Sequence, residues 1–294
     1  MLDRIEPNLL SFVAAIFIAV ARTMYRAALV RLGAGMVAML SSVITLTFAW
    51  IYYLFFSEKV AYWPLVGVAW FVVIGLVGGL AGRYMTFFSM KKVGLARTSV
   101  LMQTGLLWSS LLAILFLGER PSLAVGAGSA AIMFGTILLV QRSETERKKI
   151  STFYYLLPLA AAMFQGTSHI FRKFGFFWIH SAPLGMSLSN TVATLSLVAV
   201  MCFVTEEGGL RFWERRPMLL IFIGGVFNAF AALLFWTAVQ HGEIVEVIPI
   251  NRLSVLLIIF FSWLFFRQQE GVTWRVVTGG LLSVAGAWAI VWGR

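Results

Sequence analysis

The sequence predicts an all-α integral membrane protein, with ten transmembrane helices arranged as two inverted five-helix repeats. The first observation is composition: the 294 residues are 60% hydrophobic and only 12% charged, whereas soluble domains carry about 25% charged residues. The second is that the apolar residues fall into ten runs separated by short polar connections. The third is that the two halves of the chain share glycine and acidic positions at matching spacing. Together these exclude an ordinary soluble domain.

The ten spans follow from the length of the apolar runs, because about twenty residues of helix cross the hydrocarbon core of a bilayer. Four prolines, Pro64, Pro121, Pro183 and Pro217, lie where a span begins, a position that tolerates the missing N–H. Pro249 instead falls inside the ninth span and predicts an irregular helix there. The expected spans are about 8–30, 36–56, 63–88, 96–117, 122–140, 152–171, 183–204, 217–239, 245–266 and 273–292.

Four positions recur with identical internal spacing in the two halves. They are Glu119, Ser122, Gly128 and Gly135 in the first half, and Glu270, Thr273, Gly279 and Gly286 in the second. Since each half has an odd number of spans, the copies must insert in opposite orientations, as in many secondary transporters. We therefore divide the chain into a first repeat, 1–141, a basic linker, 142–150, and a second repeat, 151–294. The glycines are expected to serve close helix packing, and the two glutamates to act on the dipole of the helix that follows each of them.

Composition also excludes several classes of function. The only cysteine is Cys202 and the only aspartate is Asp3, and the three histidines have no helical i, i+4 pairing. These counts speak against a metal site, a disulfide and an aspartate-based membrane enzyme. No glycine-rich nucleotide loop is present, so no cofactor is expected. We assign the net charge of +11 to membrane orientation and lipid headgroups and not to nucleic acid.

The distribution of Lys and Arg predicts the orientation of the chain. Sixteen of the 23 basic residues fall on one side of the expected spans and six on the side of the termini, with Arg252 left within the ninth span. Positive charge stays in the cytoplasm. The prediction is a multi-pass protein of the inner membrane with both termini extracytoplasmic.

Three stretches resemble the EamA-type drug/metabolite transporter superfamily: Leu115-Phe-Leu-Gly-Glu-Arg-Pro-Ser122, Phe235-Trp-Thr-Ala-Val-Gln-His-Gly242 and Pro249-Ile-Asn-Arg-Leu-Ser254. The resemblance covers nearly the whole chain and implies the ten-helix fold, transport, and a cavity between the halves. Two features depart from the family. The second copy reads Arg267-Gln-Gln-Glu270 where the family has Gly-Glu, and family members commonly have cytoplasmic termini.

The leading candidate for a binding residue is Arg252, which follows Asn251 and the helix-interrupting Pro249. A charged side chain at bilayer depth usually faces a cavity or a partner, and a guanidinium group can dock a carboxylate or phosphate. An alternative is that Arg252 pairs with Glu246 or a carbonyl and only holds helices together. By resemblance to the family, the other expected lining residues are Arg83, Tyr84, Gln103, Trp108, Gln165, His169, Asn228 and Trp236. Glu246 and His169 are the candidates for proton coupling.

The sequence favours a secondary transporter that moves a small organic metabolite by alternating access. An amino acid or similar amphipathic solute is the expected substrate, its carboxylate meeting Arg252, and export the expected direction. The alternatives are a flippase for a lipid-linked intermediate and a multidrug or cation exporter, for which Trp108 and Trp236 would form an aromatic wall. An enzyme or a scaffold is disfavoured. The expected partners are the solute and membrane lipids, and the chain is expected to be a monomer or homodimer.

Overall fold

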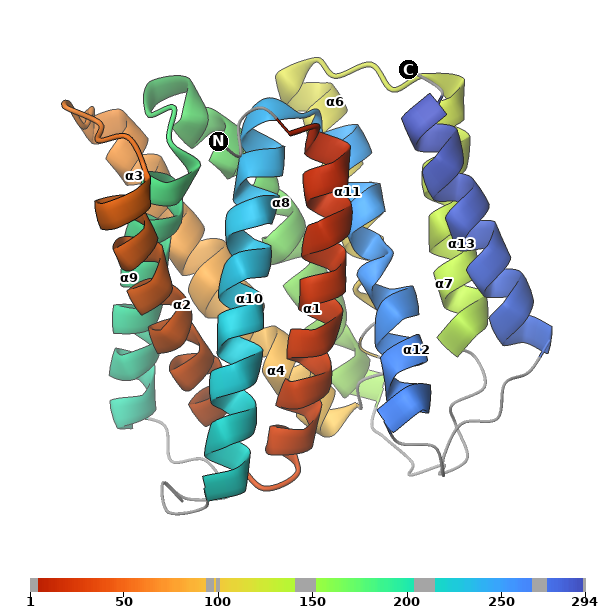
Figure 1. The fold of residues 1–294 in the computed structure, drawn as a ribbon, viewed down its shortest axis with the longest axis horizontal. Helices are drawn as coiled ribbons and strands as arrows, with labels where there is room; N and C mark the ends of the chain where they lie inside the picture. Colours follow the sequence, from red (N-terminus) through yellow and green to blue (C-terminus); the bar gives the residue numbers. More distant parts are fainter. Residues whose placement is uncertain are drawn as a thin grey trace.

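The computed structural model describes residues 5–93, 98, 101–140, 152–203, 215–265 and 274–292. Every regular element within these ranges is a helix (Figure 1). The predicted linker, 142–150, lies outside the described residues, as do Glu270 and Thr273. The all-helical fold predicted from composition is therefore confirmed for the described part of the chain.

The first half begins with two long helices, α1 (Pro7–Leu29) and α2 (Ala34–Phe56). A third long helix follows in three parts: α3 (Leu65–Ile74), the π-helical η2 (Gly75–Gly82) and α4 (Arg83–Lys92). The half closes with α6 (Thr104–Leu117) and α7 (Leu123–Val140). Because π-helical turns are rare and are found frequently at functional sites, we expect η2 to lie near a functional site.

The second half contains the short η3 (Thr152–Tyr155) and the long helices α8 (Leu156–Trp178), α9 (Ala182–Phe203) and α10 (Arg215–His241). The expected ninth span is divided into α11 (Ile244–Arg252), which contains Pro249, and α12 (Ser254–Phe265). The last helix is α13 (Trp274–Trp292). The sixth span was predicted to end at residue 171, and this was wrong: α8 continues to Trp178 and carries Arg172 and Lys173 within the helix.

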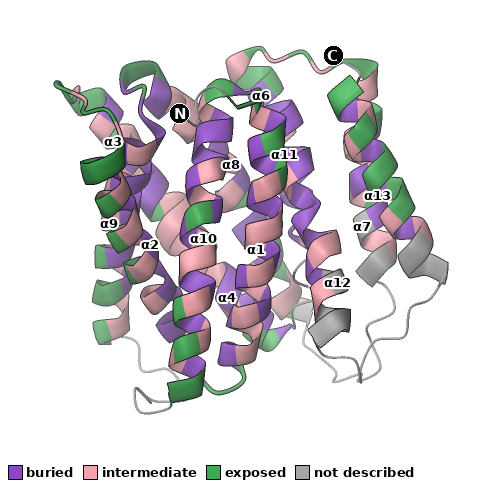
Figure 2. Cartoon of the chain, in the orientation of Figure 1, coloured by how far each residue is buried: buried purple, intermediate pink, exposed green. Residues whose placement is uncertain are grey.

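Several helices are long and apolar enough to cross a membrane. In the described residues these are Pro7–Leu29, Ala34–Phe56, Leu65–Lys92, Ala182–Phe203 and Arg215–His241, with shorter apolar helices at Thr104–Leu117, Leu123–Gly135 and Thr278–Trp292. Their outward faces carry exposed large side chains such as Leu65, Phe203 and Trp292. Figure 2 shows these exposed faces on the rim of the bundle and buried residues along its inner helices. Such a surface fits hydrocarbon better than water.

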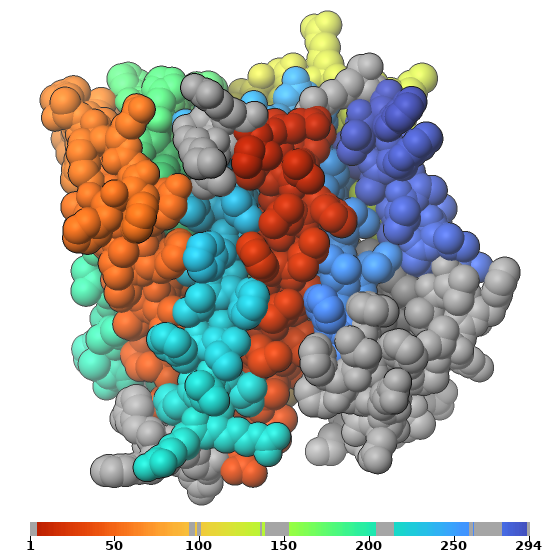
Figure 3. Space-filling model, in the orientation of Figure 1, coloured from red at the N-terminus to blue at the C-terminus, as the bar shows by residue number. Residues whose placement is uncertain are grey.

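The two halves are packed against each other and do not form separate lobes. α1 packs along α10, and the space-filling view in Figure 3 shows their side chains in contact over most of their length. α8 packs in the same way along α3, η2 and α4, and α2 lies beside α9. The start of α1 and the end of α13 lie at the same end of the bundle (Figure 1). A seam between the halves therefore runs through the middle of the molecule.

The repeated glycines bring α7 and α13 together. A Cβ atom on Gly128 would collide with the carbonyl oxygen of Gly286, and one on Gly135 would lie 2.5 Å from the carbonyl oxygen of Gly279. The matched pairs thus cross over, since the first glycine of each copy meets the second glycine of the other. The packing role predicted for these glycines is confirmed.

Glu119 joins the α6–α7 connection to α11. Gly118 ends α6 with a left-handed conformation, φ 69°, and the carboxylate of Glu119 accepts hydrogen bonds from the backbone N–H groups of Ile244 (3.0 Å) and Val245 (2.9 Å). We predicted that it would act on its own following helix, but Ser122 caps that helix by accepting from the N–H of Val125 (3.2 Å). Glu119 instead stabilises the N-terminus of α11. It thereby fixes the helix that carries Asn251 and Arg252.

Charge around this contact is balanced across the two halves. Lys173 donates from Nζ to the carbonyl oxygen of Gly242 (2.6 Å), directly before α11. Burial raises the pKa of the Glu119 carboxyl above its ordinary value, while the two backbone donors and the charge of Lys173 act in the opposite direction. The contact is thus a partly buried, charge-assisted clamp between the halves.

We expect Gly128→Ala to destabilise the protein, because the added methyl group would force α7 away from the backbone of α13. Overpacking of this kind costs about 1–3 kcal/mol. Thermal unfolding of the purified protein followed by tryptophan fluorescence should show a midpoint lower by several degrees. Gly126→Ala is the matched control, since nothing lies within 4 Å of a Cβ there. Equal midpoints for the two variants would contradict this packing.

We expect Glu119→Ala to lower the free energy of unfolding by about 1–2 kcal/mol, the value of a lost helix cap. The same unfolding measurement tests this, with Glu58→Ala as a control because Glu58 is an exposed glutamate in the connection between α2 and α3. If both variants unfold at the wild-type temperature, Glu119 does not hold α11.

Candidate functional site

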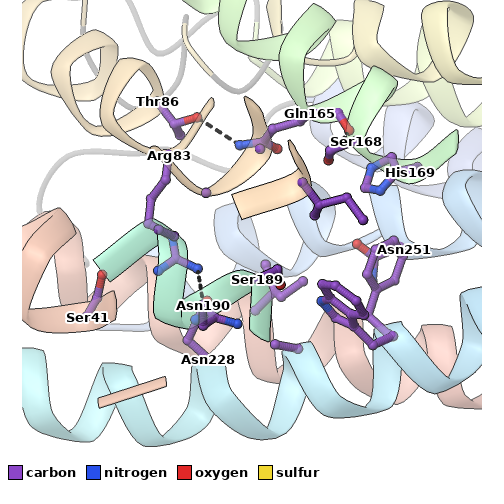
Figure 4. Close-up of a pocket in the computed structure, with 18 of the residues that line it drawn as sticks. Ser41, Arg83, Thr86, Gln165, Ser168, His169, Ser189, Asn190, Asn228 and Asn251 are labelled. Atoms are coloured by element: carbon purple, nitrogen blue, oxygen red, sulfur yellow. Dashed lines mark hydrogen bonds between the residues drawn. The ribbon is translucent and has the colours of Figure 1, made fainter. Parts of the chain in front are cut away.

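A pocket of about 210 Å³ lies at the seam between the two halves. Its walls come from α1, α2, η2 and α4 of the first half and from α8, α9, α10 and α11 of the second. Figure 4 shows polar side chains from both halves converging on this space. Its volume is below the range of about 300–1,000 Å³ that is common for drug-sized ligands, so the pocket suits a small molecule.

Four arginines line the pocket: Arg22 on α1, Arg83 on α4, Arg172 on α8 and Arg252 on α11. Their guanidinium groups are permanently charged. No aspartate or glutamate is among the lining residues that the structure describes. The charges of Arg83 and Arg172 repel each other, as do those of Arg22 and Arg252. The pocket therefore concentrates positive charge without an acidic partner of its own.

Arg83 and Arg172 present unused hydrogen-bond donors. Arg83 donates from Nη2 to Oδ1 of Asn190 (3.2 Å), the dashed contact in Figure 4, while its Nη1 is buried without a partner. Arg172 is held between Nδ1 of His169 (3.0 Å) and the face of the Trp236 ring (4.5 Å), and its Nε is buried without a partner. Buried donors are nearly always satisfied in native proteins. These two atoms therefore lack an acceptor among the residues that the structure describes.

The hydrogen bond from Arg172 requires His169 to be neutral, with Nδ1 as the acceptor. A guanidinium group only donates, so Nδ1 of His169 accepts from Arg172 and its proton resides on Nε2. Its ring also meets the edge of Phe235 at 5.3 Å. Protonating His169 would break the bond to Arg172 and add a further positive charge to the pocket.

Arg252 is the most buried of the four arginines, with 8% of its surface exposed. Its Nη2 lies so close to α6 that a Cβ atom on Gly105 would approach it to 2.9 Å. The neighbouring Asn251 donates from Nδ2 to the carbonyl oxygen of Ser11 (3.3 Å) and ties α11 to α1. The glycine on α6 thus makes room for the guanidinium group that α11 brings to the seam.

Uncharged polar side chains form a further part of the wall. Gln165 donates to Oγ1 of Thr86 (3.0 Å), and Asn228 donates to Oγ1 of Thr45 (3.1 Å). Each bond joins a helix of one half to a helix of the other. The pocket therefore has uncharged donors and acceptors beside its charges, together with apolar side chains such as Ile18, Met90 and Ile248.

Aromatic contacts bound the pocket towards both ends of the bundle. Towards the α8–α9 connection, the rings of Phe71, Phe176 and Trp236 meet with centroids 5.9–6.1 Å apart. Towards the α1–α2 connection, Tyr25 meets Phe87 edge-on at 5.5 Å. We call the first group the aromatic triad and the second the aromatic pair. All five side chains are buried.

The structure brings together seven of the ten predicted lining residues. They are Arg83, Gln165, His169, Asn228, Trp236, Asn251 and Arg252. Tyr84 is instead stacked on Phe88, because it follows Arg83 and so lies on another face of the helix. Gln103 is buried but is not among the lining residues.

Two further candidates lie away from the pocket. Trp108 borders an outward groove between α6 and α8, where its Nε1 donates to Oγ1 of Thr167 (2.8 Å). Glu246, a proton-coupling candidate, is 9% exposed and accepts from Nδ2 of Asn8 (3.4 Å). It faces α1 and is not among the pocket's lining residues.

Arg22 and Arg172 line the pocket but were not predicted to do so, although the sequence contains a pattern that could have indicated them. Ala14-Ala15-Ile16-Phe17 on α1 is matched by Ala161-Ala162-Met163-Phe164 on α8. In each copy three lining positions follow at the same spacing, Ile18, Arg22 and Tyr25 on α1 and Gln165, His169 and Arg172 on α8, and α8 adds Ser168. This i, i+4, i+7 spacing places all three on one helical face. Both arginines were counted among the connection charges: Arg172 followed the predicted end of the sixth span at residue 171, whereas Arg22 lay inside the predicted first span, 8–30.

Comparisons with known proteins agree with this architecture. The sequence model of the EamA-like transporter family matches residues 7–141 and again 152–292. An "Uncharacterized transporter YoaV" of Bacillus subtilis (strain 168) is 21% identical over 217 residues, which cover 74% of this chain and 73% of that protein. A crystal structure described only as that of a protein superposes with a TM-score of 0.78 over 98% of this chain and 99% of its own, at 16% identity, and so shares the fold. The chain is a multi-pass membrane protein that belongs to the EamA-like transporter family.

Proposed function

We propose that this protein is a secondary transporter for a small organic anion, which binds in the seam pocket and crosses by alternating access. The observation that carries the proposal is the set of four pocket arginines without an acidic lining residue. A charge at bilayer depth is costly unless it meets a partner or water. A bound anion would supply that partner and the acceptors that the buried Nη1 of Arg83 and Nε of Arg172 lack.

The same pocket argues against the other candidate substrates. An amino acid would bring an ammonium group into a pocket whose described lining has no carboxylate to receive it. A cationic drug would need an exposed aromatic face, but Arg172 already covers the face of Trp236 at 4.5 Å. A lipid-linked intermediate would need a far larger volume than about 210 Å³. A small anion without a positive group fits best.

Alternating access is supported by the arrangement of the two halves. The crossed glycine contacts of α7 and α13, the matched packing of α1 and α8, and the equivalent lining positions on those two helices are what an inverted ten-span repeat would produce. The aromatic triad and the aromatic pair would then act as the two gates. Neither Glu246, which lies outside the pocket lining, nor His169, which accepts from Arg172, is used for proton coupling in this scheme.

We retain an inner-membrane location with extracytoplasmic termini as part of the proposal. Arg22, Arg83 and Arg172 line the pocket, so they no longer count as charges of the connections. Without them, most Lys and Arg residues of the connections still lie on the side opposite the termini. The aromatic pair would then face the cytoplasm.

A thermal-shift screen of the purified protein tests the substrate class directly, since a ligand that binds only the folded state raises the unfolding temperature. Small carboxylates and phosphates should stabilise the protein, whereas amines of similar size should not. Uptake of a stabilising anion into proteoliposomes should fall by about tenfold or more in Arg252→Gln, because a hydrogen bond to a charged group contributes about 1.5–3 kcal/mol. Arg215→Gln, which removes an exposed arginine at the start of α10, should transport normally. Stabilisation by amines alone would contradict the proposal.

We expect Gly185→Ala to block transport while leaving binding in place. A Cβ atom there would lie 2.6 Å from the fully buried ring of Phe71 and would oppose closure of the aromatic triad. Since about 1.4 kcal/mol of bias changes a population tenfold, proteoliposome uptake should fall by about tenfold or more while the anion still raises the unfolding temperature. Gly280→Ala is the control, because its nearest neighbour would be 3.8 Å away. Wild-type uptake by Gly185→Ala would show that the triad is not a gate.

A further inference from the structure

We infer that the hydroxyl group of Tyr25 binds the transported anion, so that the aromatic pair of Tyr25 and Phe87 is part of the substrate site as well as a gate. This inference rests on the proposed function and adds to it a residue that contacts the substrate. A phenol keeps its proton at neutral pH and donates it. The ligand must therefore offer an oxygen acceptor at this place, as carboxylates and phosphates do.

Tyr25 carries a buried hydroxyl group that has no partner within the described part of the chain. Its side chain lines the pocket and is 2% exposed, and its Oη makes no hydrogen bond there. The lining hydroxyl of Ser41 donates instead to the carbonyl oxygen of Ala38 (3.0 Å). Since buried polar groups of native proteins are nearly always bonded, we assign the partner of Tyr25 to the contents of the pocket.

The same condition holds for two of the guanidinium groups. Among the lining residues that the structure describes, Tyr25, Arg83 and Arg172 each have a buried polar side-chain atom without a partner. A phenol oxygen is able to accept from a guanidinium group, yet the Oη of Tyr25 and the Nη1 of Arg83 do not bond to each other. An anion that accepts from both atoms would satisfy them at once, because both can donate.

Helix geometry places Tyr25 beside the charged part of the wall. Its ring meets Phe87 edge-on with centroids 5.5 Å apart, and Phe87 lies one turn after Arg83, with both residues lining the pocket. Tyr25 itself follows Arg22 by one turn on the lining face of α1. Residues one turn apart have Cβ atoms about 5–6 Å from each other. An anion beside Arg83 would therefore also lie near the phenol of Tyr25.

The ring of Tyr25 is held in place before a ligand arrives. Gly224 on α10 makes room for it, since a Cβ atom there would lie 3.0 Å from Cε1 of the ring. The edge contact with Phe87 restrains it further. A donor that is already positioned loses little freedom when a ligand binds. Because the phenol is neutral, it adds a hydrogen bond without adding charge to a pocket that already holds four arginines.

The experiment compares the wild-type protein with Tyr25→Phe, which keeps the ring but removes the hydroxyl group. Dissociation constants of succinate and inorganic phosphate are measured by titration calorimetry on the purified full-length protein. Tyr25→Phe should weaken each probe that the wild-type protein binds by about tenfold, because a hydrogen bond to a charged group is lost. Tyr62→Phe is the control, since Tyr62 is 76% exposed and is not among the lining residues.

Thermal unfolding without ligand gives an independent readout. Removing a buried hydroxyl that has no partner should leave the unfolding midpoint unchanged or raise it, because the cost of burying that group disappears. Removing a hydroxyl that is bonded within the protein should lower the midpoint. Weaker anion binding together with an undiminished midpoint is the expected result for Tyr25→Phe.

The outcomes separate the inference from the proposed function. Wild-type affinity in Tyr25→Phe, or a lower unfolding midpoint of this variant without ligand, would overturn the role of Tyr25 while leaving anion transport in place. Failure of both succinate and inorganic phosphate to bind the wild-type protein would contradict the proposed function and the inference with it.

Discussion

The central feature of the structure is a concentration of positive charge that no described lining residue neutralises. Four guanidinium groups meet at the seam of two apolar helix bundles, and the described lining of that seam offers amides, hydroxyls and aromatic rings but no carboxylate. In a low-dielectric interior such a set is strongly unfavourable unless water or a counter-ion enters. We propose that a small anion supplies this counter-charge.

The surrounding helices are organised to keep that seam narrow and reproducible. Small residues allow backbones to approach where hydrophobic burial gives no net drive in lipid. Gly128 and Gly135 join α7 to α13, and in η2 a Cβ atom on Gly75 would lie 2.6 Å from the carbonyl oxygen of Ser189 on α9. Glu119 then fixes α11 from the other half of the chain, and Lys173 bonds to the carbonyl oxygen of Gly242 just before α11 from within the same half. The guanidinium groups are thus carried on elements whose positions are set by backbone contacts.

Much of the architecture follows from the sequence because apolar length and repeat spacing are local properties. The helices, the matched glycines and the place of Arg252 in the lining of a pocket could be predicted in this way. The end of α8 could not, because Arg172 and Lys173 look like the polar end of a span, whereas in the structure one faces the pocket and the other bonds to Gly242. Trp108 is the opposite case, a residue that was predicted to line the pocket but lies outside it. Its residue type suits a cavity wall, but the packing of α6 on α8 makes it face outward.

The most direct test is to locate a bound anion crystallographically. A short carboxylic acid carrying bromine gives an anomalous signal that marks its position without assumptions about its chemistry. The account predicts a bromine peak inside the seam pocket, with the carboxylate beside one or more of the lining arginines, Arg22, Arg83, Arg172 and Arg252. Bromine peaks only on the outer surface of the helices, with the pocket filled by water alone, would contradict it.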